Sequence, residues 1–156
     1  MITTSFSGDL IGTALRQLGA SEIREIRNGI LYIIRFEFAE DLHIVYVLDV
    51  TKKDKYFLQR VSPYPMSHGR FSSANEVVQF IERDIKKFEN ATHSNNFNQF
   101  LEIADGVTRL SHAMELLFLE RNVSKEDMDK ISNHISETVE KLKVIRDHSP
   151  KIQNDK

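Results

Sequence analysis

The chain of 156 residues has no cysteine and no tryptophan, and it contains only three prolines and six glycines. Without cysteine it forms no disulfide, presents no thiol nucleophile and offers no cysteine ligand for zinc. The motifs of the common nucleotide, metalloprotease and calcium sites (G-x-x-x-x-G-K-[ST], G-x-G-x-x-G, H-E-x-x-H and the EF-hand loop) are also missing. These absences favour a non-enzymatic protein that needs no cofactor.

Strong charge and long apolar runs are missing as well. Lysine and arginine total 21 against 23 acidic residues, and the formal net charge of −2 gives no overall attraction to nucleic acid or to an anionic membrane. The longest apolar stretch, residues 30–34, is far below the roughly 20 residues that span a bilayer. The first ten residues resemble no secretory signal. We therefore expect a soluble, cytoplasmic protein that does not associate with membranes.

Hydrophobic periodicity predicts a helix followed by antiparallel strands. Ser7 and Gly19 are typical cap and stop residues for a helix over 7–19. Asn28-Gly29 is typical of a two-residue hairpin turn, which would join a strand over 22–27 to one over 30–38. Period-two alternation continues over 43–50 and, more weakly, over 56–61. The short links between these strands predict an antiparallel meander of four strands.

Both faces of this sheet are apolar near the centre of its two middle strands. Ile34, Phe36 and Tyr46 belong to one face, whereas Ile33 and Val47 belong to the other. A sheet that is apolar on both faces needs cover on both. We expect the flanking helices to cover at least one of them.

The stretch 62–71 (SPYPMSHGRF) is predicted to be an irregular loop, because its prolines and glycine disfavour regular structure. A capping box at 73–76 then opens a helix. Its expected apolar face comprises Val77, Val78, Ile81, Ile85 and Phe88.

Two long helices with heptad spacing follow, over 97–120 and 125–147. The seam of the first comprises Phe97, Phe100, Ala104, Val107, Ser111, Met114 and Phe118, and the seam of the second comprises Met128, Ile131, Ile135, Thr138, Leu142 and Ile145. At about 1.5 Å per residue each helix is about 35 Å long. Helices of that length overhang a compact body of some 95 residues, whose radius of gyration is about 12–13 Å.

The first of these helices is apolar on more than one side, so it needs more than one partner. It could lie between its own sheet and the last helix. Alternatively, two hairpins from two chains could form a four-helix bundle, and the two arrangements are compatible. The predicted assembly surface comprises Leu110, Met114, Leu117, Phe118, Met128 and Ile131.

The 62–71 stretch also holds the main candidate residues for recognition. Tyr64, Met66, His68 and Arg70 combine the aromatic, flexible and cationic side chains that are enriched at binding surfaces. His68 also has serines nearby, but no acidic residue at a recognisable spacing would orient it as a general base. We therefore predict a partner-binding loop and keep a ligand pocket or enzyme site there as the alternative.

Two other patterns favour ordinary surface roles. His112 with Glu115, and His134 with Glu137, have the reverse order of the Glu-x-x-His motif of di-metal bundles, so no metal site is predicted.

The hairpin of the last strand is basic, but acidic residues dilute this patch, which comprises Lys52, Lys53, Lys55, Arg60 and Arg70. A solvated turn that protects an edge strand is favoured, and weak nucleic-acid binding ranks third among the functions considered.

Together these patterns predict an α+β protein. Residues 1–93 form the sheet domain with its covering helix, 94–148 form a helical hairpin that packs on it or dimerises, and 149–156 form a disordered tail. At the level of topology this order is similar to that of the small chaperone domains related to type III secretion chaperones, although fold does not determine function. The expected role is an adaptor, regulator or chaperone-like protein that binds another protein or itself.

Overall fold

The computed structural model describes residue 17 and residues 29–39, 42–53 and 55–152. Within these residues the order of elements is β1 (Ile30–Ala39), β2 (Leu42–Val50), β3 (Tyr56–Ser62), β4 (Met66–Phe71), α2 (Ala74–Thr92), α3 (Phe97–Glu120) and α4 (Lys125–His148). The predicted helix over 7–19, apart from residue 17, and the predicted strand over 22–27 lie outside the described residues. So does the end of the predicted tail.

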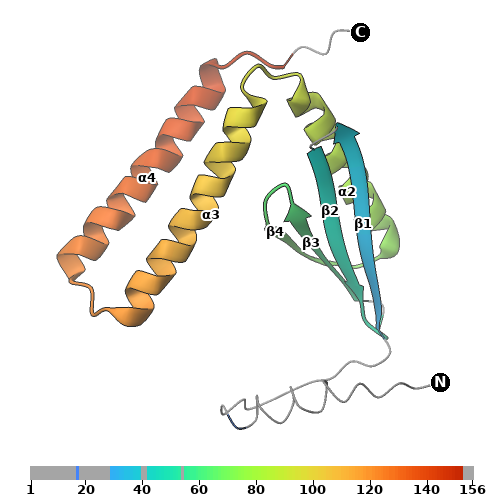
Figure 1. Cartoon of the computed structure of the whole chain (residues 1–156), viewed down its shortest axis with the longest axis horizontal. Helices are drawn as coiled ribbons and strands as arrows, with labels where there is room; N and C mark the ends of the chain where they lie inside the picture. The colour runs from blue at the N-terminus through green and yellow to red at the C-terminus, as the bar shows by residue number, and fades with distance from the viewer. Residues whose placement is uncertain (1–16, 18–28, 40–41, 54, 153–156) are drawn as a thin grey trace.

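The four strands form one antiparallel sheet in the order β1-β2-β3-β4, with α2 packed across one face (Figure 1). The predicted alternation along β2 is confirmed, because its inward side chains Ile44, Tyr46 and Leu48 are buried. These residues form the core together with Leu58, Val77, Ile81 and Phe88. The α+β class with an antiparallel sheet is therefore confirmed.

Helix α2 begins at the predicted capping box. The Glu76 amide donates to the Ser73 hydroxyl at 3.2 Å, and the Glu76 carboxylate accepts from the Ser72 amide at 2.9 Å. Val77, Ile81 and Phe88 face the sheet as predicted. Val78 does not, and its side chain is 62% exposed, because each helical residue is turned by about 100° from the one before it.

The prediction of an irregular loop over 62–71 is wrong. The chain turns at 62–65, where the Ser62–Pro63 peptide bond is cis, and β4 then pairs with β3 from Met66↔Arg60 to Phe71↔Tyr56. Both prolines lie in the turn, so neither interrupts the ladder of backbone hydrogen bonds. Gly69, with φ of +82°, adopts a conformation that suits glycine, beside the register shift between Leu58 and Gln59.

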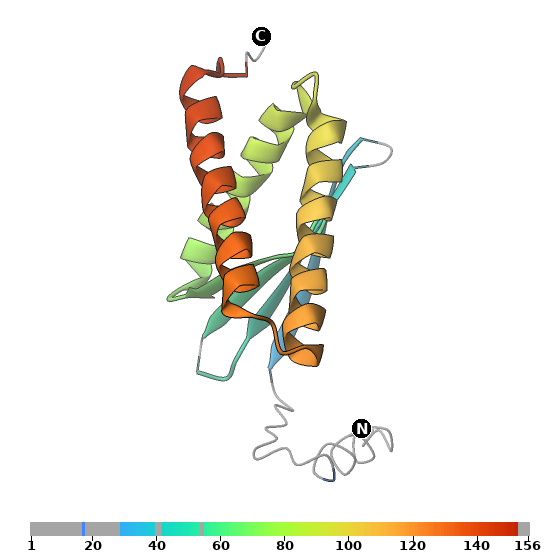
Figure 2. The ribbon, with the colours of Figure 1, turned by 90° about the vertical axis from the view of Figure 1, so that its left-hand side faces the viewer.

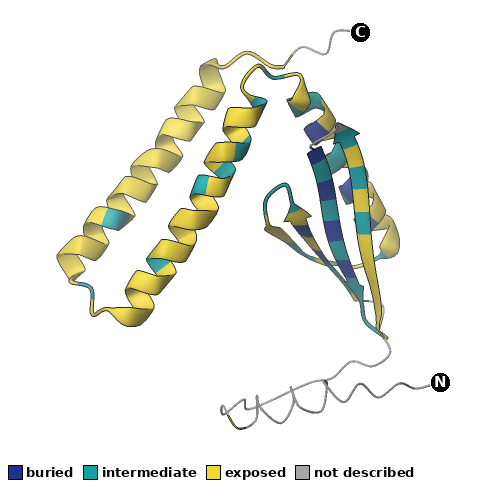
Figure 3. Ribbon diagram, viewed as in Figure 1, coloured by how far each residue is buried: buried dark blue, intermediate teal, exposed yellow. Residues whose placement is uncertain are grey.

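Helices α3 and α4 form the predicted antiparallel hairpin, which projects away from the sheet (Figures 1 and 2). Ser124 caps α4, and its hydroxyl accepts from the Asp127 amide at 3.1 Å. Phe97, at the first position of α3, packs against the core. Neither α3 nor α4, both described over their full length, has a buried residue, and Figure 3 shows them almost entirely as exposed.

No helix in the described part of the chain combines the length and the apolar character that crossing a bilayer requires.

Candidate interaction surface

Most of the exposed large apolar side chains of the described chain lie on the α3–α4 hairpin. They include most of the predicted assembly surface, because Leu110, Leu117, Phe118 and Met128 are exposed. Met114 and Ile131 are half-buried. Each side chain belongs to an apolar stripe at heptad spacing, so this surface follows the faces of the helices along their whole length.

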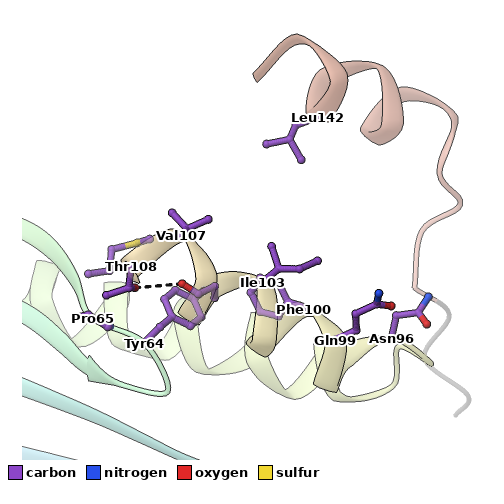
Figure 4. Close-up of a pocket in the computed structure, with 11 residues that line it drawn as sticks. Tyr64, Pro65, Asn96, Gln99, Phe100, Ile103, Val107, Thr108 and Leu142 are labelled. Carbon is purple, nitrogen blue, oxygen red and sulfur yellow. Dashed lines mark hydrogen bonds between the residues drawn. The ribbon is translucent and has the colours of Figure 1, made fainter. Parts of the chain in front are cut away.

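An apolar groove opens where α3, α4 and the β3–β4 turn meet (Figure 4). We call it the hairpin groove, and its volume is about 520 Å³. Its apolar walls are formed by Tyr64, Pro65, Met66, Phe100, Ile103, Ala104, Val107 and Leu142. Two predicted recognition residues, Tyr64 and Met66, therefore lie beside the seam of α3.

Polar groups are sparse in the hairpin groove. The uncharged amides of Asn96 and Gln99 lie together at one end (Figure 4). The Thr108 hydroxyl donates to the Ala104 carbonyl oxygen at 3.1 Å, so that donor is already used within α3. No charged side chain lines the groove. It is suited to an apolar occupant.

Aromatic contacts hold the β3–β4 turn against α3. The Tyr64 ring meets Phe100 edge to face with centroids 5.7 Å apart, and it lies 6.1 Å from the Phe88 ring. The Arg60 guanidinium carbon lies 4.5 Å from the centroid of Tyr64 and 4.8 Å from that of Phe88. This geometry is a double cation–π contact, which joins β3, α2 and the turn.

Arg60 also forms a buried ion pair with Asp84 of α2. Its Nη1 lies 2.8 Å from Asp84 Oδ2, and the Arg60 side chain is only 3% exposed. The buried Tyr46 hydroxyl donates to the same Oδ2 at 2.6 Å. Burial, and secondly this hydrogen bond to Asp84, raise the pKa of Tyr46 above its ordinary value, so the hydroxyl stays protonated as a donor.

Assigning Arg60 to an exposed basic patch was wrong. Arg60 has the same parity along β3 as Tyr56 and Leu58, and Leu58 is fully buried. Period-two alternation therefore predicts an inward side chain at position 60. Lys53 and Lys55 are exposed on the turn that precedes β3. Arg60 is buried, so its charge does not belong to the predicted basic patch on the surface.

His68 lines a second, smaller cavity together with Tyr64 and Met66, whereas Arg70 is not part of that lining. The His68 ring stacks on Phe80 of α2 with centroids 4.5 Å apart, whereas Arg70 is exposed on β4 opposite Phe57. His68 Nε2 is buried and has no hydrogen-bond partner among the described residues. Burial, and secondly the charge of Arg60, lower the pKa of His68.

The structure separates His68 from the hydroxyl of Ser62, which donates to the His43 carbonyl oxygen at 2.9 Å. The cavity that His68 shares with Tyr64 and Met66 has a volume of about 280 Å³, and the charged residues Arg60, Asp84 and Lys87 also line it. Asp84 could not be recognised from sequence spacing as a group near His68. Its carboxylate is already bound by Arg60 and Tyr46, so no nucleophile–base–acid arrangement results.

His112 and His134 of the hairpin are exposed. His134 Nδ1 lies 3.8 Å from Glu137 Oε2, and both side chains are exposed. In the described ranges, no group of three or more histidine, cysteine, aspartate or glutamate side chains is placed to hold an ion.

The chain matches none of the protein families, curated proteins or solved structures with which it was compared. Its function must therefore be argued from its own surfaces.

Replacing Arg60 with methionine is expected to lower the free energy of unfolding by about 3–5 kcal/mol, because Asp84 loses its cation in a buried site. The double variant Arg60→Met/Asp84→Asn should recover much of this loss, since no unpaired charge remains and the Asn amide oxygen can still accept from the Tyr46 hydroxyl. Urea denaturation measures both. Lys86→Met, which breaks an exposed pair with Glu82, is the control and should have little effect. A stability of Arg60→Met equal to that of the unmodified chain would contradict a structural role for the pair.

Stability should fall as the pH is lowered below about 6.5, the ordinary pKa of histidine. His68 has a lowered pKa in the folded chain, so the unfolded chain binds more protons between the folded pKa and about 6.5. Urea denaturation at pH 7.5 and at pH 5 measures the change. His68→Phe should reduce it, whereas His112→Phe, at an exposed site on α3, should not. An unchanged pH dependence in His68→Phe would contradict the lowered pKa.

Proposed function

We propose that this chain is a non-enzymatic protein-interaction module that forms a homodimer through the α3–α4 hairpin. One observation carries the proposal. Two helices of 24 residues each have apolar heptad seams, yet neither has a buried residue. The role is that of an adaptor, regulator or chaperone-like protein, whose own contacts with proteins are its activity.

The physical reason lies in how helices are stabilised. Most helical stability in proteins comes from packing an apolar face rather than from intrinsic propensity. Burying that face contributes about 25 cal/mol per Å² of apolar surface. The α3 seam contacts its own domain at its start, through Phe97 and Phe100, whereas Val107 and Phe118 farther along are exposed. The remaining length of the seam is available to a partner.

The hairpin is large enough for a stable interface. A helix of 24 residues is about 36 Å long and about 10 Å wide. Two such helices side by side therefore present roughly 700 Å², and two copies bury about 1,400 Å² in total, within the range of specific interfaces. A four-helix bundle made from two hairpins is a closed, symmetric solution.

A small-molecule site in the hairpin groove is the second candidate. Its volume of about 520 Å³ falls within the roughly 300–1,000 Å³ of ligand pockets. The groove offers few polar groups that would orient a ligand, since among the described residues that line it the amides of Asn96 and Gln99 lie together at one end. A wall formed by the α3 seam favours a protein occupant.

The variant Phe118→Glu is expected to convert the dimer into a monomer. Phe118 belongs to the α3 seam, and a charge there would be buried without a partner in the bundle. Light scattering on a sizing column measures the mass. Leu119→Glu is the matched control, because it places the same charge on the neighbouring residue, which lies off the seam and is 76% exposed.

The control variant should remain dimeric, and circular dichroism should show both variants to be helical. Equal masses for Phe118→Glu, Leu119→Glu and the unmodified chain would contradict assembly through the α3 seam.

A further inference from the structure

We propose that the two hairpins of the homodimer run antiparallel, with α3 against α3 of the second copy. In this arrangement the apolar tip of each α3, formed by Leu117 and Phe118, lies over the hairpin groove of the other copy. The inference rests on the proposed function, and it adds the orientation of the partner and the residues that meet it.

The groove and the tip are both apolar and both uncovered, but they lie at opposite ends of one helix. Ile103 in the groove is 60% exposed and Phe118 in the tip is 40% exposed. Fifteen residues separate them, which corresponds to about 22 Å along a helix. One chain cannot bring the two together, so a second copy must supply the tip.

The α3 seam is symmetric about Arg109. Phe100 and Phe118 lie nine residues from it on either side, Ala104 and Met114 lie five residues away, and Val107 and Ser111 lie two residues away. Two antiparallel copies centred there form layers that pair Phe100 with Phe118 and Val107 with Ser111. The remaining layer pairs Ala104 with Met114.

These layers combine side chains of complementary size. The small Ala104 leaves space opposite it, and the flexible Met114 side chain fills irregular space well. A parallel pair would place alanine against alanine and serine against serine. Such layers leave voids, which are costly in a close-packed interface. A parallel pair would also place groove against groove and tip against tip.

The central residue of this arrangement adds no repulsion. Arg109 lies two residues from both Val107 and Ser111, so it projects from the side of α3 opposite the seam. Its Nε lies 3.2 Å from Asp105 Oδ2, and both side chains are exposed. The two arginines therefore do not meet in the interface.

The flank of the seam explains why α3, rather than α4, lies at the centre. Ile103, Leu110 and Leu117 form a second apolar row beside the α3 seam, and all three are exposed. The corresponding residues beside the α4 seam include His134 and Lys141. The wider apolar face buries more surface against its own copy.

The β3–β4 turn becomes part of the interface in this geometry. Tyr64 and Met66 form one wall of the hairpin groove, and the Tyr64 ring contacts Phe100 of the seam. The partner's tip then contacts both the turn and α3. The predicted partner-binding residues of the turn and the predicted assembly surface thereby form one continuous site.

Engineered disulfides test the orientation, because the chain has no cysteine of its own. The double variant Ala104→Cys/Met114→Cys should form disulfides between position 104 of one copy and position 114 of the other. Within one chain these positions are about 15 Å apart along the helix, too far for a disulfide, whose Cα atoms lie within about 7 Å. After mild oxidation, peptide mapping by mass spectrometry identifies the linked positions.

The double variant Glu102→Cys/Leu116→Cys is the matched control. These positions are also symmetric about Arg109, at seven residues on either side, but they lie on the face of α3 away from the seam. Under the same oxidation the 102/116 variant should form no disulfide between the two copies, whereas the 104/114 variant should be mostly cross-linked.

Three other results are possible. Links of 104 to 104 and 114 to 114 in a dimer would overturn the antiparallel arrangement and leave the proposed function standing. A dimer by light scattering with no link would overturn the contact between the two α3 helices. A monomeric unmodified chain would overturn the proposed function and this inference together.

Discussion

The buried contact of Arg60 with Asp84 is the interaction on which the rest of the structure depends. The guanidinium lies 2.8 Å from the carboxylate, and its carbon lies 4.5 and 4.8 Å from the ring centroids of Tyr64 and Phe88. One side chain of β3 thereby holds α2 on the sheet and fixes the β3–β4 turn. Tyr64 also contacts α3, because its ring packs edge to face against Phe100. The direction in which the hairpin leaves the sheet follows from this chain of contacts.

The sheet domain and the hairpin therefore differ in how their apolar side chains are packed. The first has a core of its own, built from β2, β3 and α2. The second has an apolar surface and no buried residue, and in the proposed dimer a second copy covers that surface. Because the Tyr64 ring packs against Phe100 of α3, the hairpin groove is already formed in the single chain. A preformed site reduces the entropy that binding must overcome.

Local patterns predicted most of the elements, but not the long-range contacts. Heptad spacing predicted α3 and α4 almost to the residue, since helix periodicity is a local property. The strand at 66–71 was missed because two prolines and a glycine resemble a loop, whereas here they form a hairpin turn and a register shift. The pair of Arg60 with Asp84 joins residues 24 positions apart, and no spacing rule connects them. The one local signal was the alternation along β3, which places the Arg60 side chain on the inward face, where its charge needs a buried partner.

The molar mass of the unmodified chain in solution tests the central claim most directly. Sedimentation equilibrium over a hundredfold range of concentration should give twice the chain mass of 18.1 kDa at the upper end, with dissociation on dilution reporting the affinity. A mass of 18.1 kDa at every concentration would show that the α3–α4 surface does not bind a second copy, and would contradict the claim.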